Sequence, residues 1–181
     1  MTDTVDGCAV AHGHAEPSER SGTGSGTGSG TTRTLVAVFA SPVARHLLHF
    51  AADTGFRVAL VEPDEARRDG LPDALATVDA ADLGPDVDVV VTDHHRSELG
   101  EMLRDALARP TRWIGVLGNP RHPGPHLAAL AELGVPESEI ARVHRPVGLN
   151  IGSRTPAEIA IATLGGLIAD RNGRPGGFDF G

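Results

Sequence analysis

Three residues in the last third of the chain, Gly148, Asn150 and Gly152, lie in a loop directly ahead of a helix start. Residues 155–158, Thr-Pro-Ala-Glu, mark that start, because they fit a capping box with proline at the first helical position. Glycine lets a ligand approach the backbone closely, and the first turn of a helix offers unpaired N–H groups to an anion. The loop is therefore a candidate anion site. The alternative is that both glycines only shape the turn into the helix.

A second polar group, Asp93 and His94, follows the apolar run of residues 87–92. Histidine titrates near neutral pH, and a neighbouring carboxylate fixes which ring nitrogen carries the proton. The pair is typical of a proton relay or a ligand contact. The alternative is a solvated cluster in which Asp93 or Ser97 caps the next helix.

A third group, Gly118, Asn119 and Arg121, follows the apolar run of residues 112–117. Gly118 permits close approach to the backbone, and Arg121 can bind a phosphate through two parallel hydrogen bonds. The alternative for Arg121 is a solvated position at a helix start. His126, further along the chain, is expected to be an exposed helix residue.

Basic residues flank the loop that contains Gly148 and Gly152. His144 and Arg145 precede it, and Arg154 follows it. Together with the third group they predict a locally positive pocket on an acidic chain, which favours a polyphosphate ligand.

The loop after the first apolar run, residues 39–42, contains no glycine. Dinucleotide-binding proteins place Gly-x-Gly-x-x-Gly at this turn, so ordinary NAD(P) or FAD binding is disfavoured. Glu62, after the second apolar run, could still hydrogen-bond a ribose hydroxyl. Cys8 lies near His12 and His14, but a segment without fixed structure does not preorganise metal ligands. We predict no catalytic residue and no metal site.

The scaffold for these groups is indicated by short apolar runs that alternate with helical segments. Strands are predicted at residues 34–40, 57–61, 75–78, 87–92 and 112–117, and helices at residues 43–53, 98–108, 125–133 and from 156 onward. The predicted fold class is α/β: a single Rossmann-like, doubly wound, mainly parallel sheet with helices on both faces. In such a sheet, ligands bind outside the carboxyl ends of the strands.

Composition divides the 181 residues into a tail, one domain and a short end. Residues 1–33, with a Gly/Ser/Thr-rich run, are predicted to be a disordered tail, residues 34–172 the domain, and residues 173–181 a flexible C-terminal tail.

Sixteen basic against 24 acidic residues give a net charge of −8, which argues against nucleic acid as a partner. The chain has no apolar run long enough to span a membrane and no signal peptide, so we expect a cytoplasmic protein without a membrane partner.

Three segments resemble the XdhC/CoxI family in order and spacing: residues 142–168, residues 113–121 and residues 89–94. The resemblance covers residues 34–171 and corresponds to the C-terminal Rossmann-like domain of that family, not to its N-terminal domain. The chain departs from the family in its first loop, which is usually Gly-x-Gly-His, and in the order Thr-Asp-His where the family has Thr-His-Asp.

Members of this family assist the maturation of molybdenum hydroxylases such as xanthine dehydrogenase and carbon monoxide dehydrogenase. The resemblance implies that this chain is a maturation factor rather than an enzyme. Such a factor transiently binds molybdenum cofactor, as molybdopterin or its dinucleotide form, or it binds the apo-enzyme target. The implied partners are the hydroxylase apo-enzyme and a cofactor sulfurase, with a homo-oligomer left open. The residues assigned to the cofactor are Asp93, His94, Gly118, Asn119, Arg121, Gly148, Asn150 and Gly152. Two alternatives stay open: an NAD(P)-dependent oxidoreductase on the same fold, and a scaffold module without a small ligand.

Overall fold

The structure, a computed structural model, describes residues 32–68, 76–79, 82–119 and 121–177. By its internal contacts the chain divides into residues 1–30 and residues 31–181, and the described residues all belong to the second unit. The expected N-terminal tail, with Cys8, His12 and His14, therefore lies outside the described residues except for residues 32 and 33. Residues 178–181 of the expected C-terminal tail also lie outside them.

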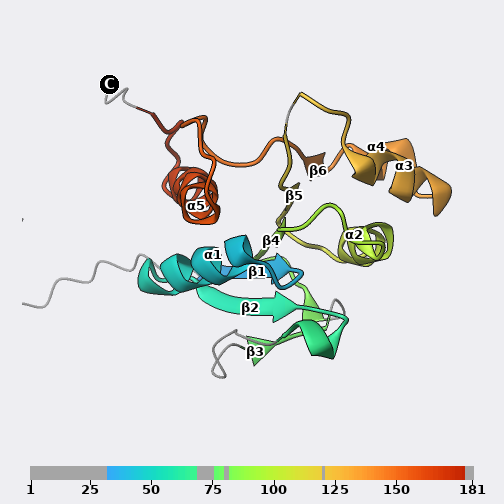
Figure 1. The fold of residues 1–181 in the computed structure, drawn as a ribbon, viewed down its shortest axis with the longest axis horizontal. Coiled ribbons are helices and arrows are strands. Elements are labelled where there is room, and N and C mark those ends of the chain that lie inside the picture. Colours follow the sequence, from blue (N-terminus) through green and yellow to red (C-terminus); the bar gives the residue numbers. More distant parts are fainter. Residues whose placement is uncertain (1–31, 69–75, 80–81, 120, 178–181) are drawn as a thin grey trace, which may run out of the picture. The chain divides into compact units, whose positions relative to one another are not determined.

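Six parallel strands form the sheet of the described chain, in the order β3-β2-β1-β4-β5-β6 (Figure 1). The strands are β1 (Thr34–Val38), β2 (Arg57–Val61), β3 (Ala76–Thr77), β4 (Val87–Val91), β5 (Trp113–Val116) and β6 (Val143–His144). Val38 at the end of β1 pairs with Val61 on one side and with Val91 on the other. The strand order reverses between β1 and β4, so the prediction of a doubly wound α/β fold is confirmed.

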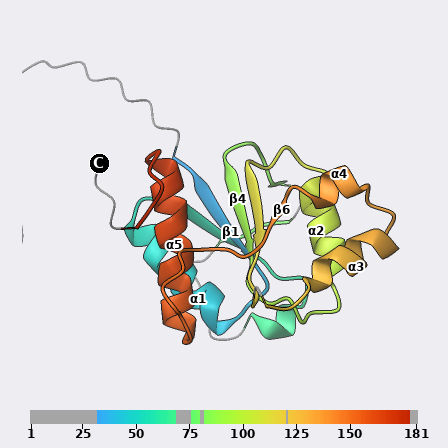
Figure 2. The ribbon, with the colours of Figure 1, turned by 90° about the horizontal axis from the view of Figure 1, so that it is seen from above.

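Helices cover both faces of this sheet, as Figures 1 and 2 show. The helices are α1 (Pro42–Asp53), η1 (Glu65–Arg67, a 3-10 helix), α2 (Leu99–Leu107), α3 (Pro125–Glu132), α4 (Glu137–Ile140) and α5 (Pro156–Arg171). Helices α1 and α5 pack together on one face, and α2 and α3 pack on the other. In the described part of the chain, no helix has both the length and the apolar character needed to cross a membrane.

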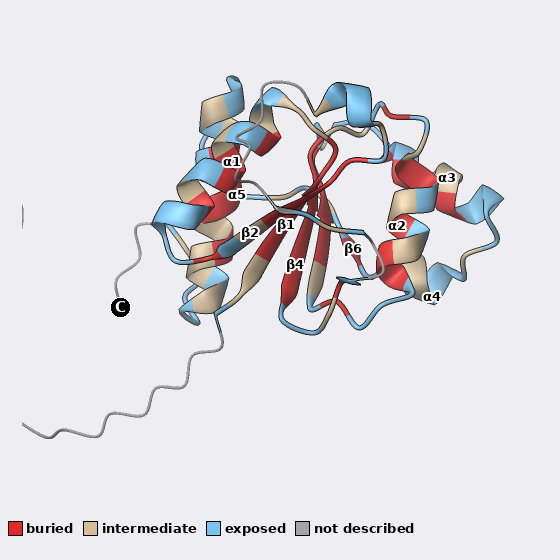
Figure 3. Ribbon diagram, turned by 90° about the horizontal axis from the view of Figure 1, so that it is seen from below, coloured by how far each residue is buried: buried red, intermediate tan, exposed pale blue. Residues whose placement is uncertain are grey.

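The core lies on both sides of β1 and β4, where successive residues point to opposite faces. Val36 of β1 packs with Leu103 of α2, whereas Leu35 packs with Leu47 of α1 and Leu164 of α5. Figure 3 shows that these central strands are buried and that each helix keeps an exposed outer side. Burial on both faces explains why the strands appear in the sequence as continuous apolar runs.

The predicted elements agree with the observed ones to within a few residues, and β2 matches its predicted range. The first strand ends at Val38 instead of residue 40, because Phe39 takes a positive φ of 72° that ends the extended backbone. The first helix starts at Pro42, one residue early, because the side chain of Ser41 accepts a hydrogen bond from the Ala44 N–H. The short elements η1, α4 and β6 were not predicted.

An ion network at the amino edge of the sheet holds the end of α5. Asp88 of β4 is fully buried and accepts a hydrogen bond of 2.8 Å from Arg112 Nε. Arg112 also contacts Asp170 of α5, which Arg33 reaches at 2.9 Å. Burial raises the pKa of Asp88, although the charges of Arg112 and Arg33 act in the opposite direction. The network places the C-terminus of α5 at the amino edge and its N-terminus toward the opposite edge, where the strands end.

Helix α5 begins with the predicted capping box. Thr155 accepts a hydrogen bond from the Glu158 N–H, and Glu158 Oε2 accepts bonds from the N–H groups of Thr155 and Arg154. The preceding loop lies against the middle of the helix, where the Leu149 N–H donates to the Ala162 carbonyl at 3.0 Å. This close approach requires a glycine at position 148.

Gly148 and Gly152 both have positive φ, of 91° and 70°, but their surroundings differ. A Cβ at Gly148 would lie 2.8 Å from the Thr163 nitrogen and 2.9 Å from the Ala162 carbonyl carbon, whereas a Cβ at Gly152 would meet no atom within 4 Å. We expect Gly152→Ala to lower the free energy of unfolding by about 1 kcal/mol, through backbone strain alone. Gly148→Ala should lower it by about 2–4 kcal/mol, because overpacking adds to the strain.

Urea denaturation of both variants and the wild type would measure this difference. Equal losses for the two alanine variants would contradict the close packing of Gly148 on α5.

Candidate functional site

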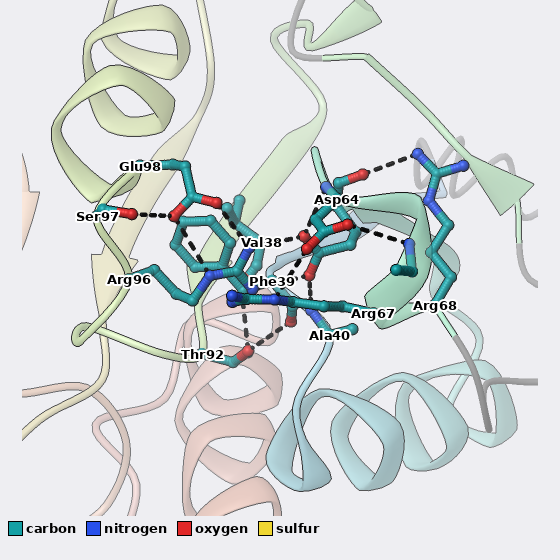
Figure 4. A network of polar contacts seen from close by, with 12 residues as sticks. Val38, Phe39, Ala40, Asp64, Arg67, Arg68, Thr92, Arg96, Ser97 and Glu98 are labelled. Carbon is teal, nitrogen blue, oxygen red and sulfur yellow. Dashed lines mark hydrogen bonds and ion pairs between the residues drawn. The ribbon is translucent and has the colours of Figure 1, made fainter.

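The loops that follow β1 and β4 meet at the carboxyl edge, where the strand order reverses. The Thr92 hydroxyl lies 3.1 Å from the Val38 carbonyl oxygen and 2.9 Å from that of Phe39, and it accepts a hydrogen bond from Ser41 Oγ at 2.9 Å. Thr92 therefore ties the end of β4 to the loop after β1 (Figure 4). This is the position at which a doubly wound sheet normally admits a ligand.

Phe39 stands where a dinucleotide-binding loop would have its first glycine. Its φ of 72° is a conformation that glycine adopts freely and that costs another residue about 1–3 kcal/mol. Its ring is fully buried. The loop thus has the backbone bend of a glycine but fills the adjoining space with an aromatic side chain.

Arg96, from the loop after β4, lies over this ring (Figure 4). It bonds to Glu62, the residue that follows β2. Arg96 Nη1 and Nη2 donate to the two oxygens of Glu62 at 3.1 and 3.0 Å, and the guanidinium carbon lies 4.5 Å from the centre of the Phe39 ring. Arg96 Nη2 also contacts Glu98 at 2.9 Å. We call Phe39, Glu62, Arg96 and Glu98 the switch-point clasp.

The charges of the clasp are compensated in a buried setting. Glu62 is 2% exposed, and its oxygens also accept hydrogen bonds from the N–H groups of Ala40 at 2.7 Å and Asp64 at 3.0 Å. Burial alone would raise the pKa of Glu62, but the bonds from Arg96 and the two backbone groups together lower it. Hydrogen bonds from Arg96, from the backbone and from Ser97 lower the pKa of Glu98 to about 2. Because Arg96 and backbone groups use both Glu62 oxygens, the expected ribose contact is not available in this arrangement.

A second group of residues lies at the ends of β4 and β5, around Arg145. Arg145 Nη1 donates to the His122 carbonyl at 2.8 Å, and Nη2 donates to the Asn119 carbonyl at 2.7 Å. The guanidinium crosses over Gly118, where a Cβ would lie 2.8 Å from Nη2. Gly118 therefore serves the close approach of Arg145, which fixes the loop after β5.

Two histidines lie near this guanidinium. Burial lowers the pKa of His94, as do the charges of His95 and Arg145. Burial also lowers the pKa of His126, with Arg145 as the second cause. The expectation of an exposed His126 is wrong: the residue is 4% exposed, since its ring packs beside Gly124. We call His94, Gly118, Asn119, His126 and Arg145 the basic loop group.

The remaining predicted residues on these loops shape turns. Asp93 Oδ1 accepts a hydrogen bond from the His95 N–H at 3.0 Å, and Asn119 Oδ1 accepts one from the Arg121 N–H at 3.0 Å. The guanidinium of Arg121 is exposed. Neither Asp93 nor Ser97 caps α2, because the N-cap position is Glu98 and no side-chain hydrogen bond is made there.

The loop of Gly148, Asn150 and Gly152 is placed differently. Gly148 packs on the middle of α5, and Asn150 and Gly152 are exposed, with no contact to the basic loop group among the hydrogen bonds of the described residues. Glu158 already accepts bonds from two of the N–H groups at the start of α5, and these backbone bonds lower its pKa. An anion at this helix start would compete with the Glu158 carboxylate.

Most positions of the basic loop group were predicted from the sequence. Of the clasp, Glu62 was named as a candidate contact, but its pairing with Arg96 was not predicted. Arg96 was not singled out, since it lies between two histidines and a serine without any motif of its own. The available signal was an acidic residue at the end of β2 and a basic residue just after β4, on strands that flank β1. Within the described ranges, no three His, Cys, Asp or Glu side chains gather as metal ligands would.

Comparisons with known proteins agree with the Rossmann-like fold. Residues 35–167 match the family described as the XdhC Rossmann domain. The chain is 34% identical over 157 residues to the uncharacterized protein YqeB of Escherichia coli K12. This match covers 79% of this chain and 28% of YqeB. The chain also matches a crystal structure of a Bacillus halodurans protein described as a xanthine dehydrogenase, with a TM-score of 0.63 and 27% sequence identity. This match covers 79% of this chain and 44% of the Bacillus chain. The chain thus spans less than half the length of these two relatives.

The lowered pKa of Glu62 predicts an acid-dependent loss of stability. A carboxylate whose pKa is lower in the folded state than its ordinary value of 4.5 stabilises the fold fully above that value, and this contribution is lost as the pH falls through the folded-state pKa. We expect Glu62→Gln to lower the free energy of unfolding by about 1–3 kcal/mol at neutral pH and to weaken its decline toward acid.

Urea denaturation between neutral pH and about pH 3 would measure both effects. Glu101→Gln, at an exposed position of α2, is the control and should follow the wild type. If the two variants lost stability in parallel, the role given to the Glu62 carboxylate would be wrong.

Proposed function

This chain belongs to the XdhC family, whose Rossmann domain it contains, and we propose that it is an accessory protein that binds molybdenum cofactor for a xanthine dehydrogenase-type enzyme. The observation that carries the proposal is the match of residues 35–167, which extends from β1 to the last turns of α5. The Bacillus relative, described as a xanthine dehydrogenase, supports the same connection.

The basic loop group suits an anionic ligand. The chain carries a net charge of −8, yet Arg145 lies beside two histidines at the carboxyl edge. Arg145 Nε and His126 Nδ1 are buried and have no hydrogen-bond partner among the described residues. A negative group bound nearby would offset this positive charge and favour protonation of both histidines. These features fit a phosphate-bearing cofactor.

Within this proposal, the exposed Arg121 guanidinium and the His94 imidazole hold the phosphate end of the cofactor, and Arg145 keeps the loop after β5 in position. The cofactor supplies redox chemistry once it is installed in the mature enzyme. The residues of this chain bind and orient it, and we assign none of them a catalytic role. The proposed partners, met in the cytoplasm, are the apo-enzyme and a cofactor sulfurase.

The position of the two loops favours the loop after β5 over the Gly148 loop as the cofactor contact. Gly148 is explained by its packing on α5, whereas the Arg121 side chain is exposed next to the basic loop group. We therefore propose that Arg121 makes the ionic contact with the cofactor. The role left to Asp93, Asn119, Asn150 and Gly152 is to shape the surrounding turns.

The test is purification without oxygen from cells supplied with molybdate, followed by measurement of molybdenum by mass spectrometry and of released pterin by absorbance. We expect both in stoichiometric amounts with the wild type. Arg121→Ala should lose about tenfold in retention, since a charge-assisted hydrogen bond contributes about 1.5–3 kcal/mol.

Arg174→Ala is the matched control, because Arg174 is also exposed but follows α5 near the amino edge. It should retain the cofactor as the wild type does. The absence of molybdenum and pterin from the wild type, in a preparation where a longer family member retains them, would contradict the proposal.

A further inference from the structure

The crevice between β1 and β4 is filled by side chains of the chain itself. In sheets of this strand order, the diphosphate of a dinucleotide passes over the end of the first strand, and a ribose bonds to an acidic residue at the end of the second. Here the first position holds the Phe39 ring, and the acidic residue Glu62 is bonded to Arg96. The guanidinium lies between these two positions, where the ligand would pass.

Other parts of a nucleotide crevice are still present. Glu62 lies at the carboxyl end of β2, as the ribose-binding residue would. The backbone at Phe39 already has the positive φ of a glycine. Glu62 also lines a cavity of about 520 Å³, together with Val61, Val78 and Met102 among others. Its volume lies in the range of small-molecule sites, roughly 300–1,000 Å³.

We propose that Arg96 acts as an internal occupant of this crevice, and that together with Phe39 it keeps nicotinamide and flavin dinucleotides out of the switch point. The guanidinium satisfies Glu62 in place of ribose hydroxyls and lies over the Phe39 ring at the end of β1. This inference goes beyond the proposed function, because it concerns the ligands that the domain excludes and does not depend on whether molybdenum cofactor binds.

The clasp is well suited to this exclusion. Arg96 is 8% exposed and is held by two carboxylates and by the face of an aromatic ring. A dinucleotide would have to displace the guanidinium from Glu62 and Glu98 together, and its diphosphate would then face the Glu98 carboxylate. Removal of the Arg96 side chain opens the crevice to water, so that the Glu62 carboxylate becomes hydrated and available to a ligand.

The test is calorimetric titration of ADP-ribose into the full chain. ADP-ribose carries the adenosine, diphosphate and second ribose of NAD without its nicotinamide. We expect no measurable binding to the wild type, and binding to the double variant Phe39→Gly with Arg96→Ala at least about tenfold tighter, about 1.4 kcal/mol, than the weakest affinity that the titration detects. Glycine at position 39 keeps the observed backbone and removes the ring.

Two further variants keep the result interpretable. If the double variant does not fold, Arg96→Ala alone should still bind about threefold tighter than the weakest affinity that the titration detects, because it opens the contact to Glu62 while leaving the core ring in place. Adding Glu62→Gln to either variant should cancel the gain, since the freed carboxylate is the ribose contact. Arg104→Ala, at an α2 position whose ion pair within the described residues is with its neighbour Asp105, should behave as the wild type.

Binding of ADP-ribose to the wild type as tightly as to folded Arg96 variants would overturn the proposal, and so would a gain that survives Glu62→Gln. A folded double variant and a folded Arg96→Ala variant that both fail to bind would do the same. None of these results bears on molybdenum retention, so failure here is distinguishable from failure of the proposed function.

Discussion

The ion pair between Arg96 and Glu62 is the constraint on which the carboxyl edge depends. Removing two charges from water costs several kcal/mol per ion, and their attraction offsets this only when the remaining hydrogen-bonding groups also find partners. Here backbone N–H groups from two loops complete the shell of Glu62. Because these partners come from the ends of β1, β2 and β4, the pair fixes three loops at once. It also covers the Phe39 ring, whose strained backbone is held by the surrounding packing.

The two edges of the sheet use charge in opposite ways. At the amino edge, Asp88, Arg112 and Asp170 join strands to the end of α5 and serve the architecture. At the carboxyl edge, the clasp joins the loops at the switch point, while the exposed Arg121 carries positive charge next to the basic loop group. In this part of the edge, the exposed positive charge lies just after β5. Rossmann domains serve many unrelated functions, because the side chains at the ends of the strands differ while the fold stays the same.

Local patterns in the sequence predicted the strands and helices well, because apolar runs and the capping box at Thr155 depend only on neighbouring residues. The pairing of Glu62 with Arg96 could not be predicted in this way, since 34 residues separate them and only the strand order brings them together. Gly148 shows the same limit: its positive φ was expected of a ligand loop, but its cause is contact with Ala162 and Thr163 on a later helix. His126 is buried for a similar reason, because the loop that carries Gly124 and the Arg145 side chain close around it.

Within the part of the chain that the structure describes, the two outermost strands, β3 and β6, are each two residues long. Long, flat outer strands expose rows of unpaired backbone groups, which recruit strands of other chains and lead to aggregation. A sheet that tapers to such short ends offers little backbone to an incoming strand. Association between copies of this domain would then have to use side chains on the helices and loops, such as the exposed Ile151 and Ile161. Such surface residues can change without altering the sheet, so that association and fold depend on different residues.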